Sequence, residues 1–286
     1  MYLFKRRNDL RHHLEQAKLK GQTIGFVPTM GALHDGHLSL VAAAKEKCDI
    51  VVCSIFVNPT QFNDPKDFEK YPITIEQDIV KLTDAGTDVL FLPSVAEMYP
   101  EGLASGKHYD FGNLEKVLEG EFRAGHFQGV GRVVHKLLDI VMPHQLFMGQ
   151  KDFQQCLIIK ELIHLLALPV QLVVCPTRRE ADGLAMSSRN VRLNAAHRQQ
   201  ATDIFKVLTA IRDQFGKVPN STLSKEAMTQ LKKDGFEPEY VEIITLRNGQ
   251  VTREDAPSAD KTVAVVLAAW LGGVRLIDNM ILQGQL

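Results

Sequence analysis

The hydrophobic pattern of the first 176 residues alternates between short, continuous apolar runs and longer amphipathic stretches. The runs are rich in Val, Ile, Leu and Phe and lack polar alternation, which is typical of strands that are buried on both faces of a sheet. We expect such strands at residues 24–27, 50–57, 89–92, 146–148 and 170–175.

Between these runs, apolar residues return at the spacing of an α-helix. This spacing is found at Leu10, Leu14 and Ala17, at Ile75, Ile79 and Leu82, at Val130, Val134, Leu137 and Val141, and from Phe153 through Leu157 to Leu166. Strands that alternate with helices predict βαβ units and a parallel sheet with helices on both faces. The expected fold class is therefore α/β, with a Rossmann-like, doubly wound parallel sheet.

The pattern changes after Pro176. A polar loop runs to Asn190, and a long amphipathic helix is expected through Ile204, Leu208, Ile211 and Phe215. Strands are expected at residues 240–246, 262–270 and 274–277, joined by the turn-rich segments 247–249 and 272–273, which favours an antiparallel sheet. We therefore expect a Rossmann-like domain over residues 1–176 and a smaller C-terminal α+β domain over residues 177–286.

Composition narrows the class of function. The chain has 33 Lys and Arg against 34 Asp and Glu, whereas proteins that bind nucleic acid usually carry a basic excess, so we expect small-molecule chemistry and no nucleic-acid partner. No apolar run approaches the roughly 20 residues of a membrane helix, and residues 1–11 are too short and basic for a signal peptide. We expect a soluble, cytoplasmic protein whose scattered Cys48, Cys53, Cys156 and Cys175 are reduced core residues.

The densest candidate site directly follows the first expected strand. It is the segment P-T-M-G-A-L-H-D-G-H, residues 28–37, with a helix after it. Ligands of doubly wound sheets bind outside the carboxyl ends of the strands, and the start of a helix offers N–H groups to phosphates. His34 and His37 fall on one face of a helical turn and can donate hydrogen bonds to phosphate oxygens. Taken alone, the pair would also fit an exposed surface or half of a metal site.

Three further segments carry candidate chemistry. Residues 149–155, G-Q-K-D-F-Q-Q, place Lys151 after another strand as a mobile charge for phosphate, with Asp152 as a helix cap; a surface lysine beside a capping aspartate is the alternative. Residues 182–190, D-G-L-A-M-S-S-R-N, suit a mobile phosphate-binding lid or, more simply, a polar linker. Gln61, in S-I-F-V-N-P-T-Q-F, can hold hydroxyl and carboxylate groups, and residues 123–129 are loop-like and can line the same cleft.

Neither the P-loop nor the complete dinucleotide fingerprint is present, since Gly129-Val130-Gly131 lacks the third glycine. Instead, the four motifs, in this order and spacing, resemble the pantothenate synthetase (pantoate–β-alanine ligase) family over essentially the whole chain. A-A-W-L-G at 268–272 and R-L-I-D-N at 275–279 add to the resemblance. The family belongs to the wider nucleotidyltransferase group with an H-x-G-H site.

The resemblance implies a two-step reaction that uses ATP and Mg²⁺. The pantoate carboxylate attacks the α-phosphorus of ATP, which gives pantoyl adenylate and pyrophosphate, and the amine of β-alanine then expels AMP. It also implies a homodimer and roles for individual residues. Catalytic roles fall to His37, His34 and Lys151, pantoate contacts to Gln61 and Gln155, and ATP contacts to Met30, Gly31, Ala32, Leu33, His34, Asp35, Gly36, His37, Gly149, Gln150, Lys151, Asp152, Arg178, Met186, Ser187, Ser188 and Arg189. No protein ligand of a metal is assigned, although Asp78 is a candidate helper.

Three positions depart from the family pattern: Ile73 stands where an arginine is common, Arg178 where a small apolar residue is common, and Ala124 where a proline is frequent. Two other functions remain open from the residues alone. An adenylyltransferase acting on a phosphate ester would use the same histidine pair, and a regulatory protein could retain a nucleotide fold without turnover. A tRNA-charging role is poorly supported, because no basic surface run is visible.

Overall fold

The computed structural model describes residues 1–63, 65–103, 106–247, 249–255 and 257–286. The chain divides into two compact units. The first consists of Met1–Phe111, Arg123–Gly149 and Gln155–Cys175, and the second of Gly112–Phe122, Gln150–Gln154 and Pro176–Leu286. The sequence predicted one division at residue 176. In the structure the C-terminal unit also contains the two earlier segments Gly112–Phe122 and Gln150–Gln154.

The first unit is built on a parallel sheet of six strands in the order β1-β4-β3-β2-β5-β6. The strands are β1 (Tyr2–Phe4), β2 (Ile24–Thr29), β3 (Ile50–Ile55), β4 (Val89–Phe91), β5 (Gln145–Gly149) and β6 (Gln171–Cys175). Five of them match the expected strands to within a few residues. β1 was not expected, because it is a three-residue edge strand whose side chains are mostly exposed.

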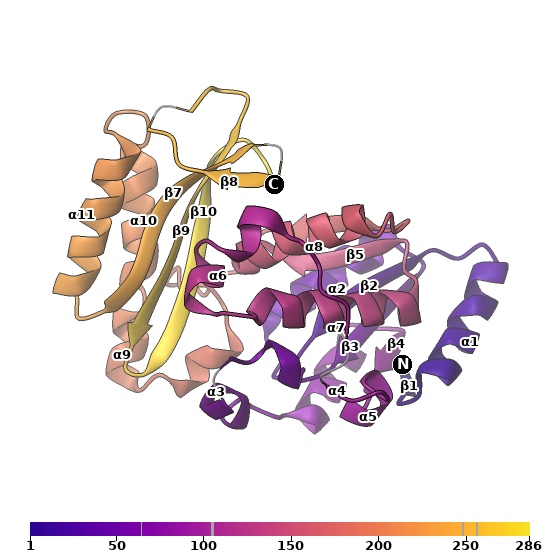
Figure 1. Cartoon of the computed structure of the whole chain (residues 1–286). Helices are drawn as coiled ribbons and strands as arrows, with labels where there is room; N and C mark the ends of the chain where they lie inside the picture. The colour runs from indigo at the N-terminus through magenta and orange to yellow at the C-terminus, as the bar shows by residue number, and fades with distance from the viewer. Residues whose placement is uncertain (64, 104–105, 248, 256) are drawn as a thin grey trace. The chain divides into compact units, whose positions relative to one another are not determined.

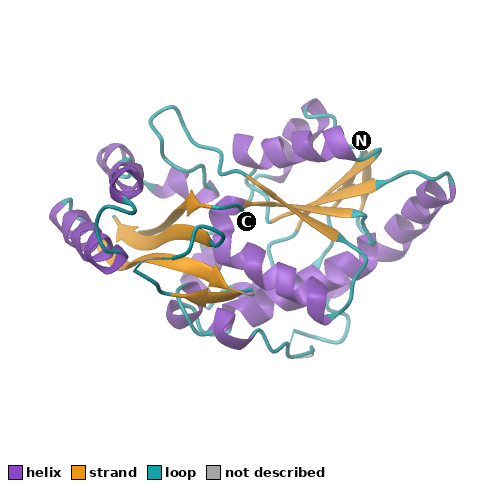
Figure 2. Ribbon diagram, turned by 90° about the horizontal axis from the view of Figure 1, so that it is seen from above, coloured by secondary structure: helices purple, strands orange, loops and turns teal. Residues whose placement is uncertain are grey.

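Helices cover both faces of this sheet, as the alternating pattern predicted (Figure 2). The longer ones are α1 (Arg7–Leu19), α2 (Asp35–Lys47), α4 (Ile75–Asp84), α7 (His126–Val141) and α8 (Phe153–Leu165). Shorter turns complete the unit: η1 (Pro59–Gln61), α3 (Pro65–Glu69) and α5 (Val95–Met98). A buried cluster that includes Val27, Val41, Val51, Leu82 and Phe147 forms part of the core.

The register of the sheet brings three strand ends together. Thr29 at the end of β2 pairs with Ile55 at the end of β3, and Ser54 pairs with Phe91 at the end of β4. Loops that leave these strands therefore start from one edge of the sheet, which is the edge where parallel α/β sheets bind ligands.

The second unit contains an antiparallel sheet in the order β10-β9-β7-β8, which confirms the predicted sheet type. Its strands are β7 (Glu237–Arg247), β8 (Gln250–Thr252), β9 (Thr262–Leu271) and β10 (Val274–Gln283), and β8 was not expected. The predicted turn at 247–249 includes residue 248, which lies outside the described residues.

Three helices accompany this sheet, where the sequence indicated one long helix. They are α9 (Ala195–Gln200), α10 (Asp203–Gln214) and α11 (Asn220–Lys233), and α10 and α11 lie along the sheet (Figure 1). The expected helix corresponds to α10 and ends just before Phe215, because the residue after it, Gly216, takes a left-handed conformation. The unit also contains η2 (Gly112–Glu115), α6 (Glu119–Phe122), η3 (Gln150–Asp152) and η4 (Ser188–Arg192).

Two further observations concern the whole chain. Within the described residues, no helix has the length and apolar character that a membrane crossing requires. Cys53, Cys156 and Cys175 are buried, as expected of core residues, whereas Cys48 is only half-buried. Burial raises the pKa of the Cys53 thiol to about 12.

Candidate active site

The segment between β2 and α2 turns sharply at Gly31 and Ala32. Both residues have left-handed backbone angles, with φ of 83° at Gly31 and 48° at Ala32. Such angles are ordinary for glycine and uncommon for alanine. Two N–H groups of the loop are held from the side by α4: Asp78 accepts hydrogen bonds from Ala32 N at 2.9 Å and Leu33 N at 2.8 Å.

His34 and His37 form a reciprocal cap on the start of α2. His34 is the N-cap residue, and its Nδ1 accepts a hydrogen bond from the N–H of Gly36 at 3.1 Å. Nδ1 of His37 accepts from the N–H of His34 at 3.3 Å. The two ring centroids are 4.1 Å apart, so the rings lie side by side, as their spacing predicted.

This cap determines which nitrogen of each neutral ring carries the proton. A backbone N–H can only donate, so Nδ1 of both histidines must be an acceptor. The proton of each neutral imidazole therefore resides on Nε2. The result is two Nε2–H donors, next to each other, at the positive end of a helix.

Gln61 is held from both sides by its neighbours in the first unit. Its side-chain Nε2 lies 3.0 Å from Sδ of Met30, and its Oε1 accepts from Nδ2 of Asn58 at 3.2 Å. Its backbone carbonyl accepts from Nδ1 of His126, at the start of α7, at 2.8 Å. Asn58 Nδ2 also lies within hydrogen-bond distance of the carbonyl of Gly129, at 3.3 Å.

The sequence did not assign roles to Asn58 and His126, although both lie in segments that it singled out. Asn58 precedes Pro59, a common arrangement at the start of a short helix, and its Oδ1 accepts from Thr60 N. The contact of His126 with Gln61 joins residues 65 positions apart, so no local signal reveals it. Gln155, the other predicted pantoate residue, is half-buried in α8.

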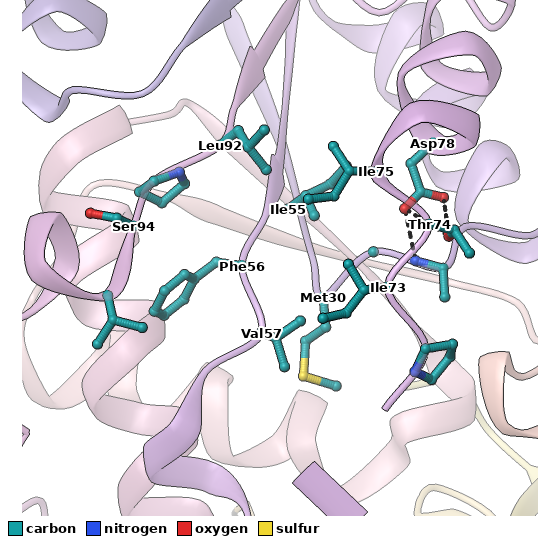
Figure 3. A pocket seen from close by; sticks show the side chains of 15 residues that line it. Met30, Ile55, Phe56, Val57, Ile73, Thr74, Ile75, Asp78, Leu92 and Ser94 are labelled. Carbon is teal, nitrogen blue, oxygen red and sulfur yellow. Dashed lines mark hydrogen bonds between the residues drawn. The ribbon is translucent and has the colours of Figure 1, made fainter. Parts of the chain in front are cut away.

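An apolar cavity of about 230 Å³ opens behind the Met30–Ala32 turn, at the ends of β2, β3 and β4 (Figure 3). Ile55, Ile75 and Leu92 are among its lining residues, and Asp78 and Thr74 lie at one side of it (Figure 3). Neither histidine nor Gln61 belongs to the lining. Ile73, the departure from the family pattern, lines it with 73% of its surface exposed.

In the second unit, the Lys151 segment is anchored by β10. Gln150, Lys151 and Asp152 form η3, which follows Gly149 at the end of β5. Asn279 Nδ2 donates to the carbonyls of Gln150 at 3.0 Å and Lys151 at 2.9 Å, and Gln150 Nε2 donates back to Asn279 Oδ1. Asn279 is thus a site-shaping residue that the sequence indicated only as part of a motif.

The side chains of Lys151 and Asp152 lie next to each other. Lys151 Nζ is 3.9 Å from Asp152 Oδ1, and 19% of the lysine side chain is exposed. Asp152 ends η3 and stands directly before the first residue of α8, which is the position where the sequence suggested a helix cap. Asn279 holds the backbone of Lys151, and the ammonium group of Lys151 lies beside the carboxylate of Asp152.

The proposed lid segment belongs to the second unit and is folded onto it. Met186 N donates to the carbonyl of Arg178, and Arg179 pairs with Ala185 in a short bridge. The side chain of Arg178 is exposed, and its carbonyl is the group that holds Met186. Ser187 Oγ accepts from Arg189 N and thereby starts η4, which contains Ser188 and Arg189.

A Cβ on Gly183 would meet the ring of Phe205 at a distance far inside van der Waals contact, so the turn at the beginning of this segment admits only glycine without a shift of its neighbour. Arg179 continues the anchoring with a bidentate pair to Asp278, at 2.6 and 3.0 Å. These contacts therefore hold the beginning of the segment to the rest of the second unit.

Comparison with known proteins places the chain in one family. The family model described as pantoate-beta-alanine ligase matches residues 2–281. Pantothenate synthetase of Cytophaga hutchinsonii is 45% identical over 280 residues, which cover 96% of each chain. The enzyme of the same name from Pseudomonas fluorescens is 42% identical over 274 residues, covering 95% of this chain and 94% of the relative.

Solved structures agree with the sequence comparison. The crystal structure of pantothenate synthetase from Thermus thermophilus superimposes with a TM-score of 0.91 at 37% identity, covering 99% of this chain and all of that one. The ligase from Francisella tularensis, solved in complex with "beta-gamma ATP" and β-alanine, gives a TM-score of 0.81 at 36% identity and covers 98% and 97% of the two chains. The chain therefore belongs to the pantoate–β-alanine ligase family, and it is a ligase that joins pantoate to β-alanine through a carbon–nitrogen bond.

Proposed function

We propose that the start of α2 binds the triphosphate of ATP and that His34 and His37 donate their Nε2–H groups to its phosphate oxygens. The observation that carries this proposal is the reciprocal cap, because it leaves both rings with a donor on Nε2. The ligase from Francisella tularensis, at 36% identity, supports ATP and β-alanine as ligands. Asp78 already occupies the N–H groups of Ala32 and Leu33, so these two residues contribute shape rather than donors.

The chemistry requires no nucleophile from the protein. A carboxylate oxygen of pantoate forms a bond to the α-phosphorus of ATP as the bond from that phosphorus to the bridging oxygen breaks, and pyrophosphate leaves. The amine of β-alanine then bonds to the acyl carbon, AMP departs with the oxygen, and the amine releases a proton. The protein aligns the reactants and stabilises charge as it develops on phosphate oxygens.

We assign the remaining roles in line with this reaction. Lys151 adds positive charge near the phosphates, and Gln61 and Gln155 hold pantoate through their amides. The segment from Met186 to Arg189 acts as the phosphate-binding lid. It protects the acyl adenylate from water, to which that intermediate would otherwise be lost. In this assignment the first unit supplies His34, His37, Gln61 and Gln155, and the second supplies Lys151 and the lid.

Mg²⁺ fits this site as a companion of ATP. Within the described residues, no group of three His, Cys, Asp or Glu side chains could hold a metal, and both oxygens of Asp78 accept backbone N–H groups. Mg²⁺ commonly keeps several waters and binds through substrate phosphates. When bound, it would supply positive charge that stabilises the leaving pyrophosphate.

The decisive experiment is pantoate-dependent exchange of labelled pyrophosphate into ATP in the absence of β-alanine. Exchange requires reversible formation of the adenylate, so we expect it to depend on both pantoate and Mg²⁺. Formation of ADP, or exchange without pantoate, would contradict the proposal. Release of AMP only after addition of β-alanine separates this reaction from adenylyl transfer to a phosphate ester and from a protein that binds without turnover.

We further propose a cytoplasmic homodimer, on the basis of the family resemblance. Sedimentation equilibrium of the purified protein should give twice the 32.0 kDa of the chain. A single species at the monomer mass, at micromolar protein concentration, would contradict this assignment.

Replacement of Gly129 by alanine should raise the KM for pantoate by about tenfold, because it displaces Gln61. A Cβ at this position would overlap the carbonyl oxygen of Thr60 and lie 2.8 Å from Cα of Gln61, and both are backbone atoms that cannot rotate away. Steady-state kinetics with pantoate as the varied substrate measure the effect.

Gly131→Ala, on the same helix, is the matched control. There the added Cβ meets the ring of Phe111 at 2.9 Å, and a side chain can give way. We expect its KM for pantoate to stay within about threefold of the unmodified enzyme, since the chain around Gln61 is not displaced. Equal KM values for the two variants would show that contact between α7 and η1 does not position Gln61.

A further inference from the structure

The carboxylate of Asp78 makes contacts that the mechanism above does not use. Asp78 is fully buried at 0% exposure, one turn into α4. Its Oδ2 accepts from Ala32 N and its Oδ1 from Leu33 N, so one side chain holds two consecutive N–H groups of the loop that precedes His34. A carboxylate that accepts backbone N–H groups in a buried site forms strong, short hydrogen bonds.

Other residues of the same helix support this contact. Thr74, the N-cap residue of α4, lies with its Oγ1 3.2 Å from both oxygens of Asp78. Lys81, one turn further along, donates from Nζ to the carbonyl of Leu33 at 2.6 Å. Asp78 and Lys81 therefore hold the N–H and the C=O of the same residue, Leu33, which fixes the orientation of that peptide segment.

The held loop has a backbone that does not form readily by itself. Ala32 has a φ of 48°, and the left-handed conformation is unfavourable for a residue with a Cβ. At Gly31 a Cβ would stand 3.1 Å from Asp78 Oδ2 and 3.1 Å from Cγ2 of Ile55, so the turn lies tightly between α4 and β3. Strained residues of this kind persist where the surroundings over-determine them.

We propose that Asp78 is a positioning residue for adenylation: it holds the Gly31–Leu33 turn so that His34 reaches the N-cap position of α2 and both imidazoles face the phosphates. It touches neither ATP nor pantoate. This role deepens the proposed function and rests on it, since the groups that Asp78 positions are the proposed phosphate donors. The carboxylate also takes up two N–H groups that would otherwise be open to phosphate, which directs the triphosphate to the imidazoles and the first turn of α2.

Asp78→Asn tests this role. An asparagine can accept one of the two backbone N–H groups, but its own NH₂ group faces the other. We expect kcat for pantoate-dependent formation of pyrophosphate to fall by about 10- to 100-fold, because a displacement of about 1 Å at catalytic groups has effects of this size. Hydrogen exchange at the amides of Ala32 and Leu33 should become faster in the same variant.

Two sets of variants separate positioning from a loss of stability. Leu10→Ala removes a fully buried side chain from α1 and should lower the urea midpoint of unfolding clearly, with kcat within about threefold of the unmodified enzyme while the protein is folded. Thr74→Val should lower kcat and Thr74→Ser should restore it, because serine keeps the hydroxyl that contacts Asp78. This pair still decides the matter if Asp78→Asn does not fold.

An unchanged kcat in Asp78→Asn would overturn the proposal. The proposal would also be overturned if kcat in Asp78→Asn and in Leu10→Ala fell in proportion to the loss of stability of each variant. If the unmodified protein shows no pyrophosphate exchange, the proposed function fails. In that case hydrogen exchange at the amides of Ala32 and Leu33 still tests whether Asp78 holds the turn. Equal protection of these amides in Asp78→Asn and in the unmodified protein would show that it does not.

Discussion

Replacement of His37 by asparagine should lower pantoate-dependent formation of pyrophosphate by about 10²–10³-fold and leave the thermal unfolding temperature almost unchanged. The amide oxygen of asparagine can take the place of Nδ1 and accept the N–H of His34, which keeps the cap on α2. The ring atom Nε2 and its proton are lost. The variant is therefore expected to remove the proposed donor to phosphate and to preserve the fold.

His34→Asn makes the same separation at the N-cap position, where asparagine is a favoured residue. Its oxygen should accept the N–H of Gly36 in place of Nδ1. His164→Asn, on an exposed position of α8, serves as the control for loss of an imidazole. If either site variant keeps a turnover close to that of the control, the histidines do not stabilise charge on the phosphates.

Replacement of Glu119 by alanine should destabilise the second unit by about 3–5 kcal/mol, since it removes one of the two carboxylates that compensate a buried guanidinium. Arg275 donates to both oxygens of Glu119 at 2.7 Å and to Glu239 at 2.6 and 2.9 Å. Burial alone would lower the pKa of the Arg275 guanidinium, but its hydrogen bonds with the two carboxylates outweigh burial and raise it. Because an arginine side chain stays protonated in proteins, the guanidinium remains charged when Glu119 is removed.

Tyr240 would lose a partner in the same variant. Its hydroxyl donates to Glu119 Oε1 at 2.6 Å, and burial, followed by the charge of Glu119, raises its pKa well above the usual value. After the substitution this buried hydroxyl has one acceptor fewer, which adds to the cost. The effect is thus the sum of a lost ion pair, with Glu239 left as the other partner of Arg275, and a broken hydrogen bond.

Fluorescence of Trp270, the one tryptophan of the chain, provides the readout. Its Nε1 donates to Glu239 Oε1 at 2.6 Å, so it reports on this network during unfolding in urea. Asp213→Ala is the control, because its pair with Arg212 is exposed and should contribute less than about 1 kcal/mol. Equal urea midpoints for the two variants would contradict a structural role of the Glu119 network.

The order of apolar and polar residues along the chain was enough to predict the class of fold and the position of the main motifs. Continuous apolar runs marked five of the six parallel strands, because central strands bury both faces and leave no polar alternation. Helical spacing marked α1, α4, α7 and α8 for a similar reason, since each buries one face. The motif around His34 could be placed at a strand–helix junction, because a buried run ends directly before it and a helical pattern follows.

The residues that hold these motifs in place are distant in the sequence, and only the folded chain brings them together. Asp78 lies 46 positions from Ala32, His126 lies 65 from Gln61, and Asn279 lies 128 from Lys151. Hydrophobic pattern and residue propensity describe neighbours along one helix or strand. Contacts between distant residues depend instead on the register of the sheet and on the packing of helices on it. The same limit applies to β1, α11 and the two early segments of the second unit, whose places are set by packing with partners far along the chain.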